Sequence, residues 1–146
     1  MSRFMRSLVL SVVAMAMTAS LVFAASPHVV GSPNVSQSGN SLTISASIAG
    51  LGNVPSATFT LAGTVDVFSR CYNRGGNKPQ ADNKQETLAV NSTATFPVRN
   101  GRTNASFTIS PLSTLQCPGS QVVVIESFSY DLDLIYMGQT LASFSG

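Results

Sequence analysis

Apolar and polar residues alternate one by one along Leu42-Thr43-Ile44-Ser45-Ala46-Ser47-Ile48. A period of two places all the apolar side chains on one face of an extended chain, which is typical of a half-buried β-strand. Turn-forming residues flank the stretch, with Ser38-Gly39-Asn40 before it and Gly50-Leu51-Gly52-Asn53 after it. We therefore predict a strand over residues 42–48 that ends at turns on both sides.

A second alternating segment runs from Ala57 to Leu61 and predicts another strand. Its apolar positions continue beyond Gly63 at Val65 and Val67, and we interpret this step as a bulge at the glycine or a change of sheet. The strand would carry Cys71 at its end.

Asn100-Gly101 is a strong β-hairpin signal, because both central residues of a tight turn can take a positive φ. Pairing across this turn would place all the apolar residues on one face, in the pairs Val98–Thr103, Phe96–Ala105 and Ala94–Phe107. Pro97 has no N–H for a ladder bond, so we prefer a four-residue loop over residues 99–102 and place the hairpin towards a sheet edge.

Strands are also predicted on both sides of this hairpin. Leu88 and Val90 predict a short strand, which Asn91-Ser92 would end. Val122–Ile125 is apolar on both faces, as expected of a central strand, and Met137-Gly138 predicts a turn into a last strand. Alternation continues between these two points at Phe128, Tyr130, Leu132 and Leu134.

Many short strands with polar turns predict an all-β fold, an antiparallel β-sandwich roughly of immunoglobulin type with one disulfide. The chain has no tryptophan, so the immunoglobulin Cys…Trp…Cys pattern is absent and the immunoglobulin label rests on analogy. The two cysteines, Cys71 and Cys117, predict a single intramolecular bond, worth about 4 kcal/mol on the chain-entropy model. A metal-binding pair and a catalytic thiol are the alternatives.

Residues 1–24 have the pattern of a secretory signal peptide. Arg3 and Arg6 form a positive start, Leu8–Phe23 is apolar, and Val22-Phe23-Ala24 offers small residues for cleavage. We therefore expect a secreted or extracellular protein, with association to the cell surface left open.

Residues 25–40 are rich in Ser, Pro, Gly and Asn, and predict either a flexible leader or a first strand interrupted by Pro33. Residues 41–146 would form a single domain. Removal of Arg3 and Arg6 leaves six basic residues against six acidic ones, so no net charge favours nucleic acid, and we expect no membrane insertion after cleavage.

The segment Cys71–Lys84 has no hydrophobic periodicity and gathers amides, cations and a tyrosine, which makes it the candidate binding loop. Its side chains could equally satisfy the loop's own backbone. The candidate binding residues are Tyr72, Asn73, Arg74, Asn77, Lys78, Gln80, Asn83 and Lys84.

Residues for catalysis are scarce. His28, the only histidine, lies in the weakly patterned leader, where no nucleophile accompanies it. Asp131 and Asp133 share a strand face, where two acids usually keep the face solvated, and with Glu126 they offer too few oxygens for calcium. We predict no catalytic residue, no metal and no cofactor.

Three pieces of the sequence occur together: Ala49-Gly50-Leu51-Gly52-Asn53, a Cys-x-Asn-x-Gly-Gly-Asn-x-Pro-x-Ala-x-Asn-Lys block over Cys71–Lys84, and Phe96-Pro97-Val98-x-Asn100-Gly101. Together they resemble a group of small secreted bacterial proteins of unassigned function, and the middle block is the specific part. The resemblance implies a bacterial, exported, single-domain protein and carries no catalytic residue across.

From these features we expect a secreted, non-enzymatic β-sandwich that acts as a binding or cell-surface structural module. Its partner would be an extracellular protein or glycan. The alternative is a carbohydrate- or protein-binding inhibitor that acts through the Cys71–Lys84 loop, and a hydrolase remains a minor alternative.

Overall fold

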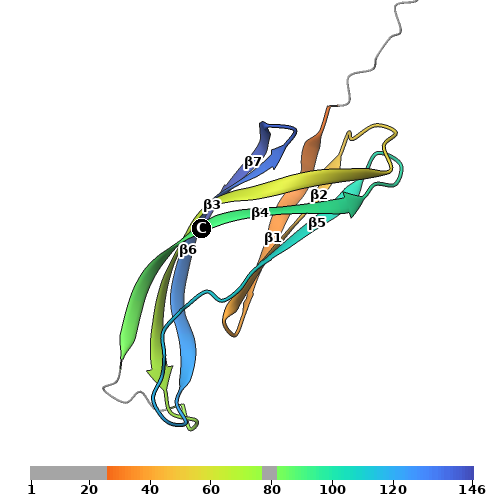
Figure 1. Ribbon diagram of the computed structural model, residues 1–146. Coiled ribbons are helices and arrows are strands. Elements are labelled where there is room, and N and C mark those ends of the chain that lie inside the picture. The colour runs from red at the N-terminus through yellow and green to blue at the C-terminus, as the bar shows by residue number, and fades with distance from the viewer. Residues whose placement is uncertain (1–25, 77–81) are drawn as a thin grey trace, which may run out of the picture.

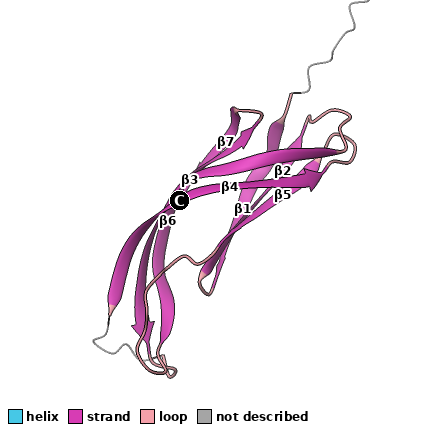
Figure 2. Cartoon of the chain, viewed as in Figure 1, coloured by secondary structure: helices cyan, strands magenta, loops and turns pink. Residues whose placement is uncertain are grey.

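The computed structural model describes residues 26–76 and 82–146, which form strands and connections without a helix (Figure 1, Figure 2). The strands pair antiparallel in two sheets, of order β1-β2-β5 and β4-β3-β6-β7. In chain order they are β1 (His28–Ser38), β2 (Ser41–Ala49), β3 (Ser56–Tyr72), β4 (Asn83–Pro97), β5 (Thr103–Ile109), β6 (Val122–Tyr136) and β7 (Gln139–Ser145). No helix long and apolar enough to cross a membrane occurs in these two described ranges.

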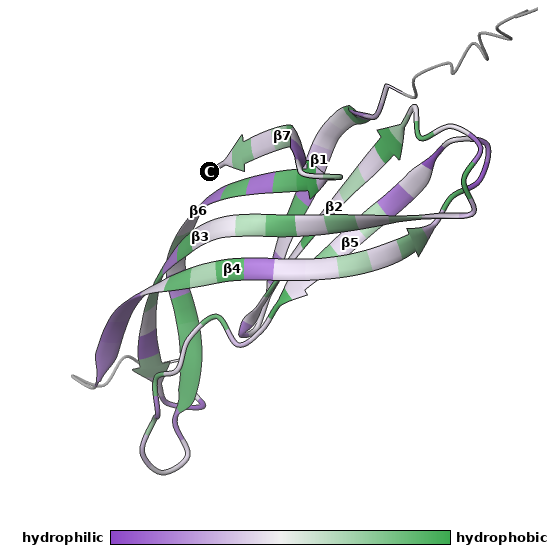
Figure 3. Ribbon diagram, turned by 45° about the horizontal axis from the view of Figure 1, so that its top comes forward, coloured by the Kyte–Doolittle hydropathy of each residue, from purple (hydrophilic) through white to green (hydrophobic). Residues whose placement is uncertain are grey.

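The two sheets pack face to face around a core of alternating side chains, visible as alternating bands of hydropathy along the strands in Figure 3. Phe96 of β4 and Phe107 of β5 meet across the sheets, with ring centroids 5.6 Å apart. The predicted β-sandwich is confirmed. With β4 added beside β3, the strand order corresponds to the ABE and C′CFG sheets of immunoglobulin-like sandwiches. The largest fully buried apolar side chains are Phe59, Leu42, Ile44, Ile48, Leu61, Leu112, Leu132 and Leu134.

Residues 28–38 form β1 and pair with β2. Of the two alternatives for residues 25–40, a flexible leader and a first strand, the structure therefore shows a strand. The register shifts between Val30 and Asn34, around Gly31 and Pro33. A proline has no N–H to donate to a ladder, so the irregularity lets the strand pass Pro33 on the outer edge of the smaller sheet.

The bulge or change of sheet predicted at Gly63 is wrong. Gly63 pairs with Val90 on one side and Leu132 on the other, with no register shift at either contact. The interval from Leu61 to Val65 is four residues, which keeps the period of two, so β3 continues straight through. The glycine instead permits a close backbone approach, since a Cβ at this position would lie 2.1 Å from the carbonyl oxygen of Asp131.

β4 is a long strand, and the short strand predicted to end at Asn91-Ser92 is wrong. Asn91 and Ser92 pair with Ala62 and Leu61 of β3, so the ladder passes through them. The alternation of half-buried and exposed positions also continues there, with Ser92 half-buried. Two polar residues therefore do not end a strand when the residues before and after them in the chain continue to alternate between the two faces.

The predicted β4–β5 hairpin is wrong, although its turn is real. Asn100 and Gly101 both take positive φ, of 52° and 71°, and Arg99 and Arg102 exchange both backbone hydrogen bonds across them at 2.9 and 3.0 Å. The turn therefore has two central residues rather than four. Beyond it the strands separate into different sheets, so β4 pairs with β3 and β5 with β2.

The separation has a local cause at Pro97. Its missing N–H cannot continue the ladder, and its carbonyl oxygen instead accepts the Thr103 hydroxyl at 2.7 Å. The N–H of Val98 bonds to Pro55 at 3.0 Å. The apolar residues of the predicted pairs still face the core, but β4 and β5 contribute them from different sheets. Both strands lie at sheet edges, as expected.

β6 lies between β3 and β7, as expected of a central strand, but β7 pairs only with its Asp131–Tyr136 portion. The Val122–Ile125 portion has a ladder partner only in β3. In Figure 1 the strands β3, β4 and β6 continue well beyond the smaller sheet. We call this extension the arm, comprising residues 66–72 of β3, 83–87 of β4 and 122–129 of β6.

Candidate functional site

A bulge at Glu126 determines which side chains the arm presents on each face. Phe68 pairs with Ser127 but its neighbour Ser69 pairs with Ile125, so Glu126 is the extra residue in β6. Because directly opposed residues share a face, Ile125 lies on the same inner face as the fully buried Ser69. The neighbouring Val124 therefore lies on the outer face, which explains why this stretch is apolar on both sides.

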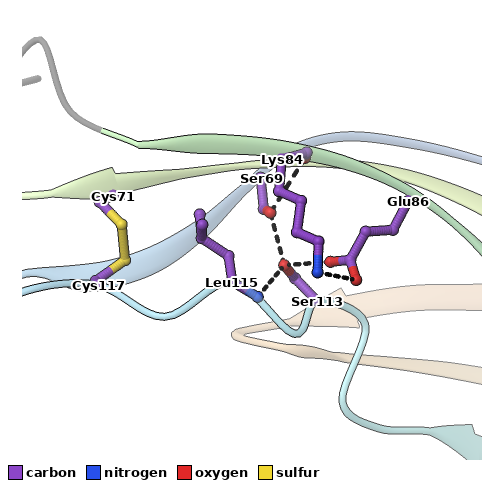
Figure 4. The surroundings of a disulfide bond; sticks show 7 residues. All are labelled: Ser69, Cys71, Lys84, Glu86, Ser113, Leu115 and Cys117. Carbon is purple, nitrogen blue, oxygen red and sulfur yellow. Dashed lines mark hydrogen bonds and ion pairs between the residues drawn. A yellow bond between two sulfur atoms is a disulfide. The ribbon is translucent and has the colours of Figure 1, made fainter.

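The connection between β5 and β6, residues 110–121, covers the inner face of the arm, and we call it the strap. Cys117 of the strap is bonded to the fully buried Cys71 of β3, with Cα atoms 5.6 Å apart (Figure 4). The predicted disulfide is confirmed, so the metal-pair and free-thiol alternatives are excluded for these cysteines. Leu112, near the other end of the strap, is fully buried and belongs to the hydrophobic core.

Ser113 anchors the middle of the strap through hydrogen bonds in two directions. Its hydroxyl lies 2.6 Å from that of Ser69 on β3, and both serines are buried. Asn40, in the β1–β2 turn, accepts the Ser113 N–H at 2.8 Å and donates to its carbonyl oxygen at 3.0 Å. The strap is thus joined to both sheets by bonds that leave the buried hydroxyls satisfied.

Glu86 of β4 lies against the same part of the strap, with its side chain 12% exposed. One carboxylate oxygen accepts the Ser113 hydroxyl and the Thr114 N–H, each at 2.9 Å, and the other accepts the Thr114 hydroxyl. The Lys84 ammonium lies 3.0 Å away. Burial by itself raises the pKa of Glu86, but the hydrogen bonds from Thr114, Lys84 and Ser113 outweigh it and lower the pKa from 4.5 to about 2.

The outer face of the arm differs in chemistry from the rest of that sheet. Phe68, Arg70 and Tyr72 follow one another on this face of β3, and the Arg70 guanidinium lies over the Phe68 ring, 5.5 Å from its centroid. The Tyr72 hydroxyl donates to Glu126 of β6. Val122, at the start of β6, is 47% exposed. We call these residues, with Val124, the arm face.

A shallow hollow of about 250 Å³ lies at the upper end of the arm face. Its apolar lining includes Phe68 and Phe128, and Asp66, Gln85 and Ser127 contribute polar groups. The hollow is open to solvent and belongs to a sheet surface, not to a loop. A flat ligand or a protein surface fits this shape better than an enclosed small molecule.

The structure places the described members of the predicted binding residues in four environments. Tyr72 lies on the arm face, Asn73 and Arg74 are exposed in a turn where the Asn73 carbonyl accepts the Gly76 N–H at 2.9 Å, and Asn83 is exposed at the start of β4. Lys84 points to the strap, where it pairs with Glu86. The predicted residues Asn77, Lys78 and Gln80 lie outside the described residues.

Phe68 and Arg70 were not among the predicted binding residues. A consistent reading of the period of two along β3 would have found them, since Phe59, Val65 and Cys71 are buried and the even-numbered positions therefore face outward. No sequence signal indicated Glu86 as part of the strap contact, because its partners are 27 and 28 residues away.

The other candidates for chemistry are dispersed. His28 lies at the start of β1 with its Nδ1 2.9 Å from the Ser26 carbonyl oxygen, and Asp133 accepts the Ser143 hydroxyl on the exposed side of β6 and β7. Within residues 26–76 and 82–146, no three His, Cys, Asp or Glu side chains gather as a metal site would require.

No protein-family model matches this chain, and no curated protein matches it either.

Proposed function

We propose that the protein is a secreted, non-enzymatic β-sandwich that binds an extracellular protein or glycan through the arm face and the adjoining Cys71–Lys84 loop. The observation that carries this proposal is the change of composition along the outer face of β3. Its upper part presents Thr58 and Thr60, which bond to threonines of β4 at 2.7 and 2.8 Å. Its lower part presents Phe68, Arg70 and Tyr72.

Aromatic residues and arginine are the types enriched at protein interfaces and among the residues that dominate binding energy. A row of threonines is sufficient for a sheet face that contacts solvent. Folding of the sheet therefore does not require Phe68, Arg70 and Tyr72 in place of threonines on the lower part of β3. The half-exposed Val122 adds apolar area to the same surface.

The strap supports this function from the opposite side of the sheet. Three long strands that extend beyond their sandwich would bend and lose their inner apolar cover if nothing lay beneath them. The disulfide, the Glu86 contacts and the Ser69–Ser113 bond fix the arm before a partner arrives. A preformed surface lowers the ordering cost of binding. A disulfide is also compatible with an extracellular location.

The test compares a double variant, Phe68→Ser with Val122→Ser, with the native protein in a glycan array and in a pull-down from culture medium. We expect the variant to lose the ligands that the native protein retains, at an unchanged melting temperature. Thr64→Ser, exposed on the same face of β3 above the arm, is the matched control and should bind as the native protein does.

Arg74→Ala separates this proposal from an inhibitor that acts through the loop. Arg74 is exposed in the turn that follows β3. If Arg74→Ala abolishes binding while the Phe68 and Val122 double variant retains it, the loop is the contact and the arm face is not. Retention of all ligands by both variants would contradict binding at this end of the molecule.

A further inference from the structure

Two arginines face one another at the end of the molecule opposite the disulfide. Arg99 and Arg102 flank the two-residue turn between β4 and β5, which Figure 3 shows as a hydrophilic tip. The Leu51 N–H bonds to the Gly101 carbonyl oxygen at 3.0 Å, so the turn is held against the β2–β3 connection.

This pairing is unfavourable unless something compensates it. Residues that exchange both backbone bonds project their side chains from the same face, and like charges directly opposite each other destabilise a pair of strands. Both arginines are exposed, and within the described ranges neither guanidinium has a carboxylate partner. The six acidic residues of the chain are Asp66, Asp82, Glu86, Glu126, Asp131 and Asp133, and none of them lines this region.

Both arginines line a hollow of about 490 Å³ on the outer side of the smaller sheet. Its wall includes Asn104, whose side-chain oxygen accepts the Ser47 hydroxyl at 2.7 Å. That bond fixes the amide and leaves its N–H groups without a hydrogen bond to any residue that the structure describes. Val30, 40% exposed, adds an apolar contact.

We infer that this hollow is a binding site for an oxyanion group, a carboxylate or a sulfate, carried by a small extracellular ligand. The two guanidinium groups and the Asn104 amide donate to the anion, and Val30 contacts the ligand's carbon skeleton. The planar guanidinium forks match both carboxylate and sulfate oxygens, and the volume lies in the range of small-ligand sites. The site is separate from the arm face and does not depend on its function.

The experiment is an NMR titration of backbone and side-chain amides at constant ionic strength, with sodium sulfate, D-glucuronate and neutral glucose as probes. We expect saturable shifts confined to residues 99–104 and Ser47 with sulfate, glucuronate or both, and none with glucose. The anion that saturates at lower concentration identifies the preferred oxyanion. Arg99→Gln with Arg102→Gln should weaken binding by about tenfold or more, since charge-assisted hydrogen bonds are lost.

Thr108→Ser, exposed on β5 but outside the lining of the hollow, is the control and should leave the titration unchanged. If the double variant does not fold, Arg102→Lys replaces it, because it keeps the charge and loses the planar fork, and weaker binding is again expected. Shifts that never saturate, shifts equal at all arginines, binding of glucose, or an unchanged titration in these variants would overturn the inference.

Discussion

Glu86 joins two segments that lie far apart in the sequence, and its ionisation state controls how strongly they are joined. Its folded-state pKa of about 2 lies below the ordinary 4.5, because hydrogen bonds from Thr114, Lys84 and Ser113 favour the charged form. A depressed carboxyl pKa stabilises the fold fully above pH 4.5, and the contribution is lost as the pH falls towards 2.

We therefore predict that Glu86→Gln lowers the free energy of unfolding at pH 7 by on the order of 2 kcal/mol, with the difference from the native protein vanishing near pH 2. Urea denaturation at several pH values measures this. Thr93→Ser, exposed on β4 and removing no titratable group, is the control and should lack this pattern. A constant difference between pH 2 and pH 7 would show that the charge is not responsible.

Gly63 is the second residue whose identity the packing demands. Its φ is 142°, and a Cβ there would lie 2.1 Å from the Asp131 carbonyl oxygen. We predict that Gly63→Ala costs about 2 kcal/mol or more, through backbone strain and displacement of β6. Gly75→Ala, where a Cβ meets nothing within 4 Å, should change stability by less than about 0.5 kcal/mol. Equal melting temperatures for the two variants would contradict the close approach.

The β4–β5 turn connects the two sheets, so its chemistry affects their packing. Asn100 and Gly101 hold positive φ, which a β-branched side chain disfavours. We predict that Gly101→Val lowers the free energy of unfolding by about 1–3 kcal/mol. Gly101→Asn is the control, because asparagine tolerates this conformation far better. Thermal unfolding of both variants measures the effect, and a valine variant as stable as the asparagine variant would show that the turn can relax.

Most strands could be predicted from the sequence because their inner and outer positions alternate in a sandwich. The turn at Asn100-Gly101 could be predicted as well, since φ preference is local. The pairing of the strands could not be predicted from the sequence. The same turn residues occur where two strands form a hairpin and where two strands enter different sheets. The difference depends on bonds such as Val98 to Pro55, 43 residues earlier.

The candidate site shows the same division. The disulfide followed from the cysteine count. Predicting the arm face required the alternation of inward and outward residues in β3 to continue without a break through Gly63. The apolar outer side of β6 depends on a bulge at Glu126. A bulge is a two-strand property, and one strand's sequence does not specify it.

The molecule as a whole is a sandwich with an extension, and the two parts are stabilised differently. The sandwich has a core between two sheets, whereas the arm has one sheet with the strap beneath it. The disulfide closes a loop across 46 residues, so its removal should cost up to about 4 kcal/mol of stability.

We predict that Cys71→Ala with Cys117→Ala leaves the sandwich folded and loosens the strap. Amide hydrogen exchange should accelerate in residues 110–121 and in the arm, while Leu42, Ile44 and Phe59 stay protected, because they lie in the core between the two sheets. Glu86→Gln in the same background should accelerate exchange further, since the two contacts hold the strap at different points. Uniform acceleration over the whole chain would mean that the arm and the sandwich unfold as one cooperative unit, and that the strap stabilises the entire fold.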